Sequence, residues 1–473
     1  MKISELLYGV DYVGEFEDCE ISGVFDDSRE VQKNGVFFAF TTSELGIKYA
    51  NESVQNGAVA IISEEKISIK NNIIVKNLKE SFKDFLNKFY DYPLRKMMII
   101  GITGTNGKTS TSKIISNVLN YAGLKTGYIG TLGATWGDNH IDLLNTTPGC
   151  KEFYEIIAKM KKDGVMCVVC EVSAHAIAQN RLCNIFFDIG VFTNISQDHL
   201  DYFKTMEEYT KVKLDFFDEK SCKYCIVNSD TKEGREIMQK RASSVLSYGI
   251  ENPADVFGID FNESNEKQTF VANVMDEVYL IESKLLGEFN RYNLLASLAV
   301  CRMLGVSGRR LVECIKKVDR IEGRFNVYKG RKTVIIDYAH TPDGMRNILK
   351  EARKMTDGKV VCVFGCGGNR DKLKRPIMGS IAEEESDVVI LTSDNSRDEK
   401  VGDIFLDIIK GMKEYPIVLP DRGEAIQFAL NRNKNDEIVV ILGKGAEKYI
   451  EKCGKREYFS DAEVVEKTLK SLT

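Results

Sequence analysis

The chain has 473 residues, which exceeds the size of one ordinary core and predicts two to four domains at roughly 100–200 residues each. Hydrophobic residues make up 43% and charged residues 29%, and the formal net charge is −5, so the basic excess of a nucleic-acid-binding protein is absent. The N-terminus lacks the apolar core of a signal peptide, and no run of about 18 apolar residues predicts a membrane span. We therefore expect a cytoplasmic monomer that binds neither membrane nor nucleic acid.

Three segments differ in their patterns of apolar residues. Short apolar runs between polar stretches predict a small α/β domain over residues 1–92, and the segment DYPLRK at 91–96 is typical of a boundary. Residues 93–328 begin with a strand, a glycine-rich turn and a helix, and later strands alternate with helices, which predicts a largely parallel sheet. Over 329–473, the strands TVIID, VVCVFG, DVVILTS and EIVVILG alternate with helical stretches and predict a Rossmann-like domain. The expected fold class is therefore α/β with three domains.

A glycine-rich turn follows the strand MMIIGIT and opens a helix, which is the arrangement that binds nucleotide phosphates. A strict Walker motif would need a glycine at Ile102, so the generic spacing fails by one position. Lys108 can still reach the β- and γ-phosphates of ATP, and the Thr109 hydroxyl can bind Mg²⁺. The predicted ATP-binding loop comprises Gly104, Thr105, Asn106, Gly107, Lys108 and Thr109.

Two CxxC pairs raise the question of a zinc site. Cys167 and Cys170 lie in a predicted buried strand, where positions i and i+3 face opposite sides and cannot share a metal. Cys222 and Cys225 also lie in a strand-like segment. We interpret both pairs as reduced thiols that are partly buried.

Further motifs occur in order along the chain: NTTPG (145–149), EVSAHAIAQNR (171–181), FTNISQDHLDYF (192–203), DYAHTPDG (337–344), DNSRDE (394–399) and GKGAE (443–447). Together with TGTNGKT at the loop, they resemble the Mur ligases of bacterial cell-wall precursor synthesis, in particular the member that adds the third amino acid. The resemblance implies that ATP phosphorylates the D-Glu carboxylate of UDP-MurNAc-L-Ala-D-Glu and that an amine then attacks the acyl phosphate. It assigns UDP binding to residues 1–92, ATP binding to 93–328, and amino-acid binding and closure over ATP to 329–473.

The resemblance also implies roles for single residues. It places Asn290 and Asn293 near adenine, Asp337 near the ribose, and Arg324 and His340 near the phosphates. Its residues for the UDP-MurNAc-dipeptide are Ser28 at the uracil end, with Asn145, Thr146, Thr147, Ser173, Gln179 and Arg181. The family's N-terminal G-x-x-x-D-G-H pattern is not recognisable in residues 41–50, so no uridine contacts are assigned there.

A Mg²⁺ site is expected from Thr109, Glu171, His199 and Lys213, with Lys108, Glu171, His199 and Lys213 as the catalytic set. Tyr209, Val212 and Phe216 form an apolar helical stripe that includes Lys213, whereas Lys211 points away from it. Burial should lower the pKa of Lys213, and a neutral lysine can react with CO₂. In the family, the lysine 14 residues after the DHL histidine is carbamylated, and Lys213 has that spacing from His199. The resemblance thus implies N6-carboxylysine at 213; the alternative is a lysine whose amine reaches water.

The residues expected to bind the added amino acid are Arg370, Asp394, Asn395, Arg397, Gly443 and Glu447. Members that add meso-diaminopimelate carry DNPR, and this chain keeps the arginine but has Ser396 in place of the proline. Asn369, Ala446 and Phe203 also depart from the family pattern, which leaves meso-lanthionine or L-lysine as alternative substrates. An ordinary surface ion pair of Arg397, a folylpolyglutamate synthetase and a non-catalytic homologue are the other interpretations.

Overall fold

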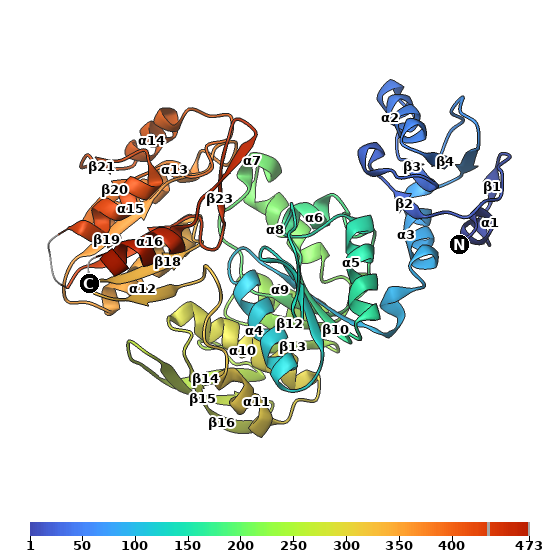
Figure 1. Ribbon diagram of the computed structural model, residues 1–473. Helices are drawn as coiled ribbons and strands as arrows, with labels where there is room; N and C mark the ends of the chain where they lie inside the picture. The colour runs from blue at the N-terminus through green and yellow to red at the C-terminus, as the bar shows by residue number, and fades with distance from the viewer. Residues whose placement is uncertain (433–435, 472–473) are drawn as a thin grey trace. The chain divides into compact units, whose positions relative to one another are not determined.

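The computed structural model describes residues 1–432 and 436–471, and the chain forms two compact units (Figure 1). The first unit contains residues 1–100 and 125–188, and the second contains 101–124 and 189–473. Both combine helices with sheets, so the predicted α/β class is confirmed. The domain boundaries expected after residues 92 and 328 stay predictions.

The N-terminal part of the first unit is a five-stranded sheet within the described residues, in the order β1-β5-β4-β3-β2. Its strands are parallel except for β1. Its elements are α1 (Ile3–Leu7), β1 (Tyr12–Val13), β2 (Gly23–Phe25), η1 (Ser28–Glu30), β3 (Gly35–Ala39), α2 (Glu44–Gln55), β4 (Ala58–Ser63), β5 (Asn72–Val75), α3 (Leu78–Phe89) and η2 (Pro93–Lys96).

The remainder of the first unit pairs β7 with β10 in parallel and extends from β7 through antiparallel β8 and β9. Strands β6 (Met98–Thr103) and β11 (Phe187–Phe192) each begin in this unit and end in the other. The further elements are β7 (Thr126–Gly130), β8 (Gly133–Trp136), β9 (Asn139–Ile141), α5 (Cys150–Lys162), β10 (Cys167–Glu171) and α6 (Ala174–Ala178).

The second unit pairs β12, β13 and β14 in parallel and continues with antiparallel β15 and β16. Its elements before residue 320 are α4 (Lys108–Tyr121), α7 (Leu200–Phe203), α8 (Met206–Asp215), β12 (Cys222–Asn228), α9 (Lys232–Lys240), β13 (Val245–Gly249), β14 (Val256–Glu263), β15 (Gln268–Val274), β16 (Glu277–Ser283), α10 (Glu288–Met303) and α11 (Gly308–Lys316). The antiparallel strands were not expected from the apolar runs. In β15 buried and half-buried residues alternate, as in a strand with one covered face.

The C-terminal sheet of the second unit has the order β17-β18-β22-β19-β20-β21. All neighbours are parallel except β17 and β18, and the four predicted apolar strands are β18, β19, β20 and β22. The elements of this part of the chain are β17 (Asn326–Lys329), β18 (Thr333–Asp337), α12 (Pro342–Lys354), β19 (Val360–Phe364), α13 (Lys374–Glu385), β20 (Val388–Leu391), α14 (Val401–Ile409), β21 (Ile417–Val418), α15 (Arg422–Asn431), β22 (Ile438–Leu442), β23 (Tyr449–Lys452), β24 (Lys455–Tyr458) and α16 (Asp461–Ser471). Strands β23 and β24 form a separate two-stranded sheet.

Helices cover both faces of this sheet (Figure 1). Alternate strand residues such as Val440 and Cys362 pack with α12, α13 and α14, and their neighbours Val439 and Val361 pack with α15 and α16. Because successive residues of a strand point to opposite faces, a strand buried on both faces is apolar throughout. The continuous apolar runs in the sequence therefore identify this doubly wound arrangement.

One buried ion pair links α15 to the start of α16. Arg422 donates from Nε and Nη2 to the Asp461 carboxylate, both at 2.7 Å, and neither side chain is exposed. Replacing Arg422 with methionine leaves Asp461 buried without its partner, so we expect a loss of about 3–5 kcal/mol in unfolding free energy. Denaturant unfolding measures this. Arg353→Met is the control, because its pair with Asp387 is partly exposed and should contribute about 1 kcal/mol or less. Equal shifts in the two variants would contradict the prediction.

One of the two CxxC pairs departs from the expectation for a regular strand. Cys167 and Cys170 are buried in β10 with buried residues between them. Cys222 and Cys225 are also buried, but Lys223 and Tyr224 between them are both exposed, so the two thiols face the same side and their Sγ atoms lie 3.7 Å apart. Strict alternation therefore fails at the start of β12.

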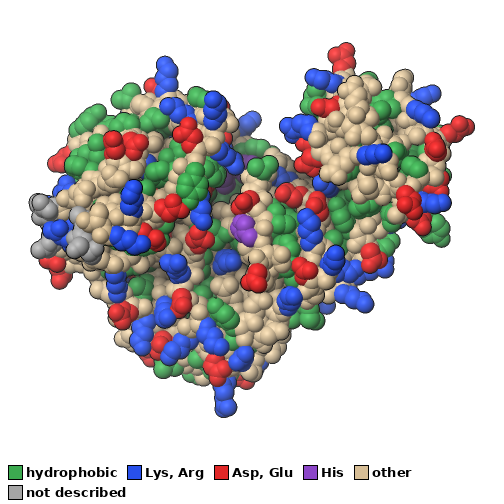
Figure 2. Space-filling view, in the orientation of Figure 1, with side chains coloured by type: hydrophobic (Ala, Val, Ile, Leu, Met, Phe, Trp, Pro, Cys, Tyr) green, Lys and Arg blue, Asp and Glu red, His purple; other side chains and the backbone are tan. Residues whose placement is uncertain are grey.

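The surface carries mixed charge. Acidic and basic side chains are interspersed over the face shown in Figure 2. In the described part of the chain, none of the helices has the length and apolar surface that crossing a bilayer requires.

Candidate active site

The predicted phosphate loop is present between β6, which ends at Thr103, and α4, which begins at Lys108. Gly104 has φ +147° and Gly107 has φ +84°, conformations that residues with a Cβ rarely adopt. A Cβ on Gly104 would lie 1.9 Å from Thr193 Oγ1, and one on Gly107 would lie 2.6 Å from Asn293 Oδ1. The backbone turn at the start of α4 thus depends on glycine, and its location at a helix N-terminus fits an anionic phosphate.

Replacing Gly104 with alanine should displace this loop, because the new Cβ overlaps Thr193 and the backbone conformation is strained. At about 1–3 kcal/mol of strain, we expect roughly tenfold to hundredfold weaker binding of ATP. Calorimetric titration with ATP measures the affinity. Gly123→Ala is the matched control, because Gly123 also has a positive φ, +96°, but no atom lies within 4 Å of its added Cβ. An unchanged affinity of Gly104→Ala would contradict this account of the loop.

The side-chain nitrogens of two lysines contact the loop backbone. Lys108 Nζ donates to the carbonyl oxygens of Gly104 and Thr105, both at 2.8 Å, and Lys213 Nζ donates to the Gly104 carbonyl at 2.7 Å. Lys213 is 1% exposed, whereas the side chain of Lys211 is 76% exposed. Burial, reinforced by the Lys108 charge, lowers the pKa of Lys213 well below its usual value. The predicted burial and pKa direction of Lys213 are therefore confirmed.

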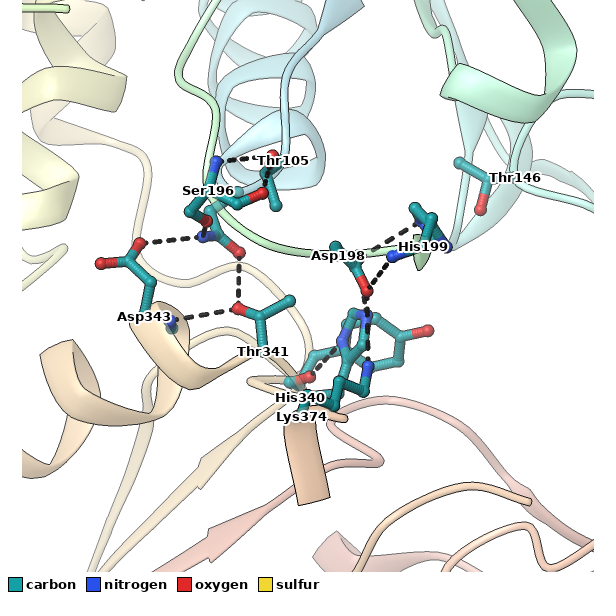
Figure 3. A network of polar contacts seen from close by, with 12 residues as sticks. Thr105, Thr146, Ser196, Asp198, His199, His340, Thr341, Asp343 and Lys374 are labelled. Carbon is teal, nitrogen blue, oxygen red and sulfur yellow. Dashed lines mark hydrogen bonds and ion pairs between the residues drawn. The ribbon is translucent and has the colours of Figure 1, made fainter. Parts of the chain in front are cut away.

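Asp198 lies at the centre of a polar network (Figure 3). Its carboxylate lies 3.3 Å from His199 Nε2, 3.7 Å from His340 Nε2 and 3.4 Å from Lys374 Nζ. Burial acts against ionisation, but the Lys374 ammonium and the two histidines hold the pKa of Asp198 well below its usual value. The structure thus brings His199 and His340 together on one carboxylate. Asp198 and Lys374 were not assigned a role from the sequence, although Asp198 lies inside the motif at 192–203.

Asn106 links the loop to the segment after β18. Its side-chain nitrogen Nδ2 donates to Ser196 Oγ at 3.2 Å and to Asp343 Oδ2 at 3.1 Å. Its side-chain oxygen Oδ1 accepts from Thr341 Oγ1 at 3.3 Å. On the other side of the loop, the hydroxyls of Thr105 and Tyr209 lie 3.0 Å apart. The loop is therefore held by residues that are distant in sequence.

Arg324 reaches the predicted Mg²⁺ ligand Thr109. Its Nη2 donates to Thr109 Oγ1 at 2.9 Å, and its guanidinium carbon lies 4.4 Å from the centre of the Tyr338 ring. The arginine expected to bind the γ-phosphate thus contacts the first turn of the loop helix.

Asn293 joins α10 to α4. Its Oδ1 accepts from Thr111 Oγ1 at 3.1 Å, and its Nδ2 donates to Asn290 Oδ1 at 3.0 Å.

Asp337 is 6% exposed and accepts from the backbone nitrogens of Phe325 at 2.7 Å and Ala339 at 2.6 Å. Burial raises its pKa, although the Arg324 charge and these two hydrogen bonds act against the rise. The two carboxylate oxygens therefore accept from the backbone just before β17 and just after β18. The expected ribose contact of Asp337 stays a prediction.

Glu171 ends β10 in the first unit, and its side chain is fully buried. Its carboxylate accepts from Tyr128 Oη at 2.5 Å and from the Thr131 backbone nitrogen at 3.1 Å. Thr147 Oγ1 donates to the Glu171 carbonyl at 2.7 Å and accepts from the Ser173 backbone nitrogen at 3.0 Å. The strand end predicted for Glu171 is confirmed, and two of the expected substrate residues, Thr147 and Ser173, lie beside it.

The other expected substrate residues of the first unit are more dispersed. Thr146 Oγ1 lies 3.2 Å from Thr131 Oγ1, and Gln179 Oε1 accepts from Arg181 Nε at 2.8 Å. Asn145 is exposed. Ser28 lies in η1, where its hydroxyl donates to Glu52 Oε2 at 2.6 Å.

The residues expected to bind the added amino acid lie around the ends of β20 and β22. Asn395 Nδ2 donates to Glu447 Oε2 at 3.0 Å, and its Oδ1 accepts from Lys444 Nζ at 3.2 Å and from the Glu451 backbone nitrogen at 2.9 Å. A Cβ on Gly443, where φ is +109°, would lie 2.5 Å from Asp394 Oδ2. The fully buried Lys444 was not assigned a role from the sequence, although it lies in the GKGAE motif.

Two arginines flank Gly367 beside this cluster. A Cβ on Gly367 would lie 3.1 Å from Arg397 Nη1 and 3.8 Å from Arg370 Cγ. Arg397 Nη1 donates to the Gly368 carbonyl at 2.7 Å, and its Nε lies 3.9 Å from Glu451 Oε2. Arg370 Nη1 donates to the Asn369 carbonyl at 3.0 Å. Two guanidinium groups next to an amide and a carboxylate can bind a group that carries both an anion and a cation.

Known proteins resemble this chain along most of its length. The model of the Mur ligase middle domain matches residues 102–301, and that of the Mur ligase glutamate ligase domain matches residues 323–445. A Bacillus cereus protein named UDP-N-acetylmuramoyl-L-alanyl-D-glutamate–2,6-diaminopimelate ligase is 38% identical over 467 residues, covering 96% of this chain and 95% of its own. The Aquifex aeolicus protein of that name is 39% identical, covering 95% and 94%.

A solved structure titled as the same ligase superimposes with a TM-score of 0.69 at 30% identity, covering 100% of this chain and 99% of that chain. The matches therefore extend over the loop, the Asp198 network and the C-terminal cluster. The chain belongs to the Mur ligase family of ATP-dependent ligases that form amide bonds.

Proposed function

We propose that this ligase adds meso-2,6-diaminopimelate to the D-Glu carboxylate of UDP-MurNAc-L-Ala-D-Glu, in the synthesis of cell-wall precursors in the cytoplasm. The observation that carries the proposal is 38–39% identity, over at least 94% of each chain, to two proteins whose name states this reaction. The cluster of Asn395, Arg397 and Glu447 supports the choice of amino acid, because it combines cationic and anionic groups.

In the first step, a D-Glu carboxylate oxygen attacks the γ-phosphorus of ATP, and ADP leaves. The product is an acyl phosphate. The 104–107 backbone and the α4 N-terminus would hold the phosphates, and Lys108 would offset their charge. Arg324, which already contacts Thr109, would bind the γ-phosphate as it transfers.

In the second step, the amine of the amino acid attacks the acyl carbon. The tetrahedral intermediate loses phosphate and a proton, which leaves the amide. The cluster around Asn395 would orient the distal end of the amino acid, so that only one amine reaches the acyl phosphate. Catalysis would then rest on positioning and charge neutralisation.

The proposed Mg²⁺ ligands remain Thr109, Glu171, His199 and a modified Lys213. Hydroxyl and carboxylate oxygens are ligands that this ion accepts, and a carbamate on Lys213 would supply a further anionic oxygen. When bound, Mg²⁺ would neutralise phosphate charge during transfer. Whether these residues can bind Mg²⁺ depends on the form of Lys213. As an amine it donates to the Gly104 carbonyl, and only its carbamate offers oxygen ligands to the metal.

Carbamylation needs a neutral amine, and the burial of Lys213 favours that form. The amine nitrogen would attack CO₂, and one proton would be released as the N–C bond forms. The buried neutral amine would then become an anionic carbamate, whose charge a bound Mg²⁺ would offset.

Phosphate release with ATP, Mg²⁺ and meso-diaminopimelate tests the acceptor. We expect turnover with UDP-MurNAc-L-Ala-D-Glu and none with a reduced folate, the acceptor of the alternative folylpolyglutamate synthetase. The control omits the amino acid, and the amide product is identified by its mass. Turnover with the folate alone would overturn the proposal.

A further inference from the structure

The cysteine pair at the start of β12 has no part in the proposed reaction. Cys222 and Cys225 are both fully buried, and their Sγ atoms lie 3.7 Å apart. The exposed residues Lys223 and Tyr224 separate them, so both thiols project inward from the same strand. A disulfide has an S–S length of about 2.05 Å, so the two sulfurs would need to approach by less than 2 Å.

A buried arginine faces this pair. Arg241 is 7% exposed and donates to the carbonyl oxygens of Phe217, Cys222 and Lys223, and its Nη1 lies 3.9 Å from Cys222 Sγ. In the residues that the structure describes, Arg241 forms no ion pair. Its positive charge is thus balanced by carbonyl dipoles and directed at a thiol.

This environment distinguishes the two sulfurs. A hydrogen bond from Cys225, together with the Arg241 charge, lowers the pKa of Cys222, although burial acts in the opposite direction. The same contact, with burial, raises the pKa of Cys225. The thiolate is the reactive form of cysteine, so Cys222 is the nucleophile and Cys225 the resolving thiol.

We propose that Cys222 and Cys225 form a dithiol site that a peroxide oxidises to an intrachain disulfide. The Cys222 thiolate attacks one peroxide oxygen, the O–O bond breaks, and a sulfenic acid and hydroxide result. Cys225 then attacks the sulfenic sulfur, the S–O bond breaks, and water leaves. With hydrogen peroxide, two thiols lose two electrons and two protons, and two waters form.

The site adjoins the helix that carries Lys213. A Cβ on Gly190 would lie 3.0 Å from Cys222 Sγ and 3.2 Å from the rings of Phe216 and Phe217, which follow α8. Arg241 also holds the Phe217 carbonyl. The chemistry of the pair is independent of the proposed ligase reaction, so its test does not need turnover.

The chain contains its own control. Cys167 and Cys170 share the CxxC spacing and complete burial, but the residues between them are buried as well. Burial raises the pKa of Cys167 to about 12 and also raises the pKa of Cys170. We therefore expect this pair to stay reduced under conditions that oxidise the other.

The experiment treats the reduced full-length protein with hydrogen peroxide, blocks the remaining thiols under native and then denaturing conditions, and maps tryptic peptides by mass. Trypsin cleaves after Lys223, so the peptides 221–223 and 224–232 stay joined only by a disulfide between Cys222 and Cys225. We expect the joined product, and its loss on reduction with dithiothreitol. Separate peptides with alkylated cysteines, while the exposed Cys453 is oxidised, would overturn the proposal.

Two variants test the assigned roles. Arg241→Met should slow formation of the joined peptides by about tenfold, because loss of the Arg241 charge raises the pKa of Cys222 and reduces the thiolate fraction. Cys225→Ser should leave a sulfenic acid on Cys222 that dimedone traps, and this test holds even if Arg241→Met does not fold. Two results would contradict the assignment. One is oxidation of Cys167 and Cys170 to the same extent as Cys222 and Cys225. The other is that dimedone labels Cys225 in the Cys222→Ser variant but does not label Cys222 in the Cys225→Ser variant.

Discussion

Replacing Lys213 with alanine is expected to reduce the rate of phosphate release by at least about 10²-fold to 10³-fold, the usual effect of removing one charge-stabilising group. The side chain is 1% exposed, its amine contacts the Gly104 carbonyl, and burial lowers its pKa, so a carbamate can form there. Without the side chain, the proposed Mg²⁺ ligand and the support of the loop are both lost. The measurement is kcat with saturating ATP and both co-substrates.

Two comparisons separate the carbamate from a merely structural lysine. Lys211→Ala, on the same helix but with a 76% exposed side chain, should keep full activity. Short carboxylates such as formate or acetate should restore part of the activity of Lys213→Ala, because they can occupy the space of the carbamate. Full activity of Lys213→Ala would contradict the catalytic role, and a lack of rescue in a folded protein would contradict the carbamate.

Replacing Arg397 with alanine should raise the KM for meso-diaminopimelate by roughly 10-fold to 150-fold, which corresponds to a lost charged hydrogen bond of about 1.5–3 kcal/mol. The guanidinium is held by the Gly368 carbonyl beside Asn395, where it can bind the distal carboxylate of the substrate. Because that carboxylate is absent from L-lysine, any residual activity with L-lysine should be unaffected. Initial rates over a range of each amino acid measure both values.

Lys400→Ala is the control for Arg397, because Lys400 lies three residues later on the same segment and is exposed. Its KM should not change. If Arg397→Ala raised the KM values for meso-diaminopimelate and L-lysine equally, Arg397 would stabilise the fold of the cluster and would not bind the distal carboxylate. The ordinary surface ion pair considered from the sequence would predict no change at all, and its nearest acid, Glu451, lies 3.9 Å away.

The fold was predictable where strands are buried on both faces. The apolar runs of β18, β19, β20 and β22 identify the C-terminal sheet, because both of its faces are covered by helices. The antiparallel strands β14, β15 and β16 have no such runs, since only part of each strand is covered. The side to which Cys222 and Cys225 point was also not predictable, because the start of β12 is irregular and brings both residues to one side of the strand.

The site was predictable where a local pattern has one physical cause. The glycines of the loop and the burial of Lys213 beside Tyr209 are of this kind, and both are confirmed. The contact between Asp198 and Lys374 joins residues that are 176 positions apart, and no periodicity connects them. Likewise, the hydrogen bonds of Asp337 to backbone nitrogens could not be read from a strand ending in an acid.

The most direct test of the central claim is phosphate release with ATP, Mg²⁺ and UDP-MurNAc-L-Ala-D-Glu, comparing meso-diaminopimelate, meso-lanthionine and L-lysine. Addition of diaminopimelate predicts turnover with that amino acid, weaker turnover with the similar lanthionine, and at most a small residual rate with L-lysine. Preference for lanthionine would assign the changes at Asn369, Ser396 and Ala446 to specificity. Turnover with L-lysine alone, or with none of the three, would contradict the account.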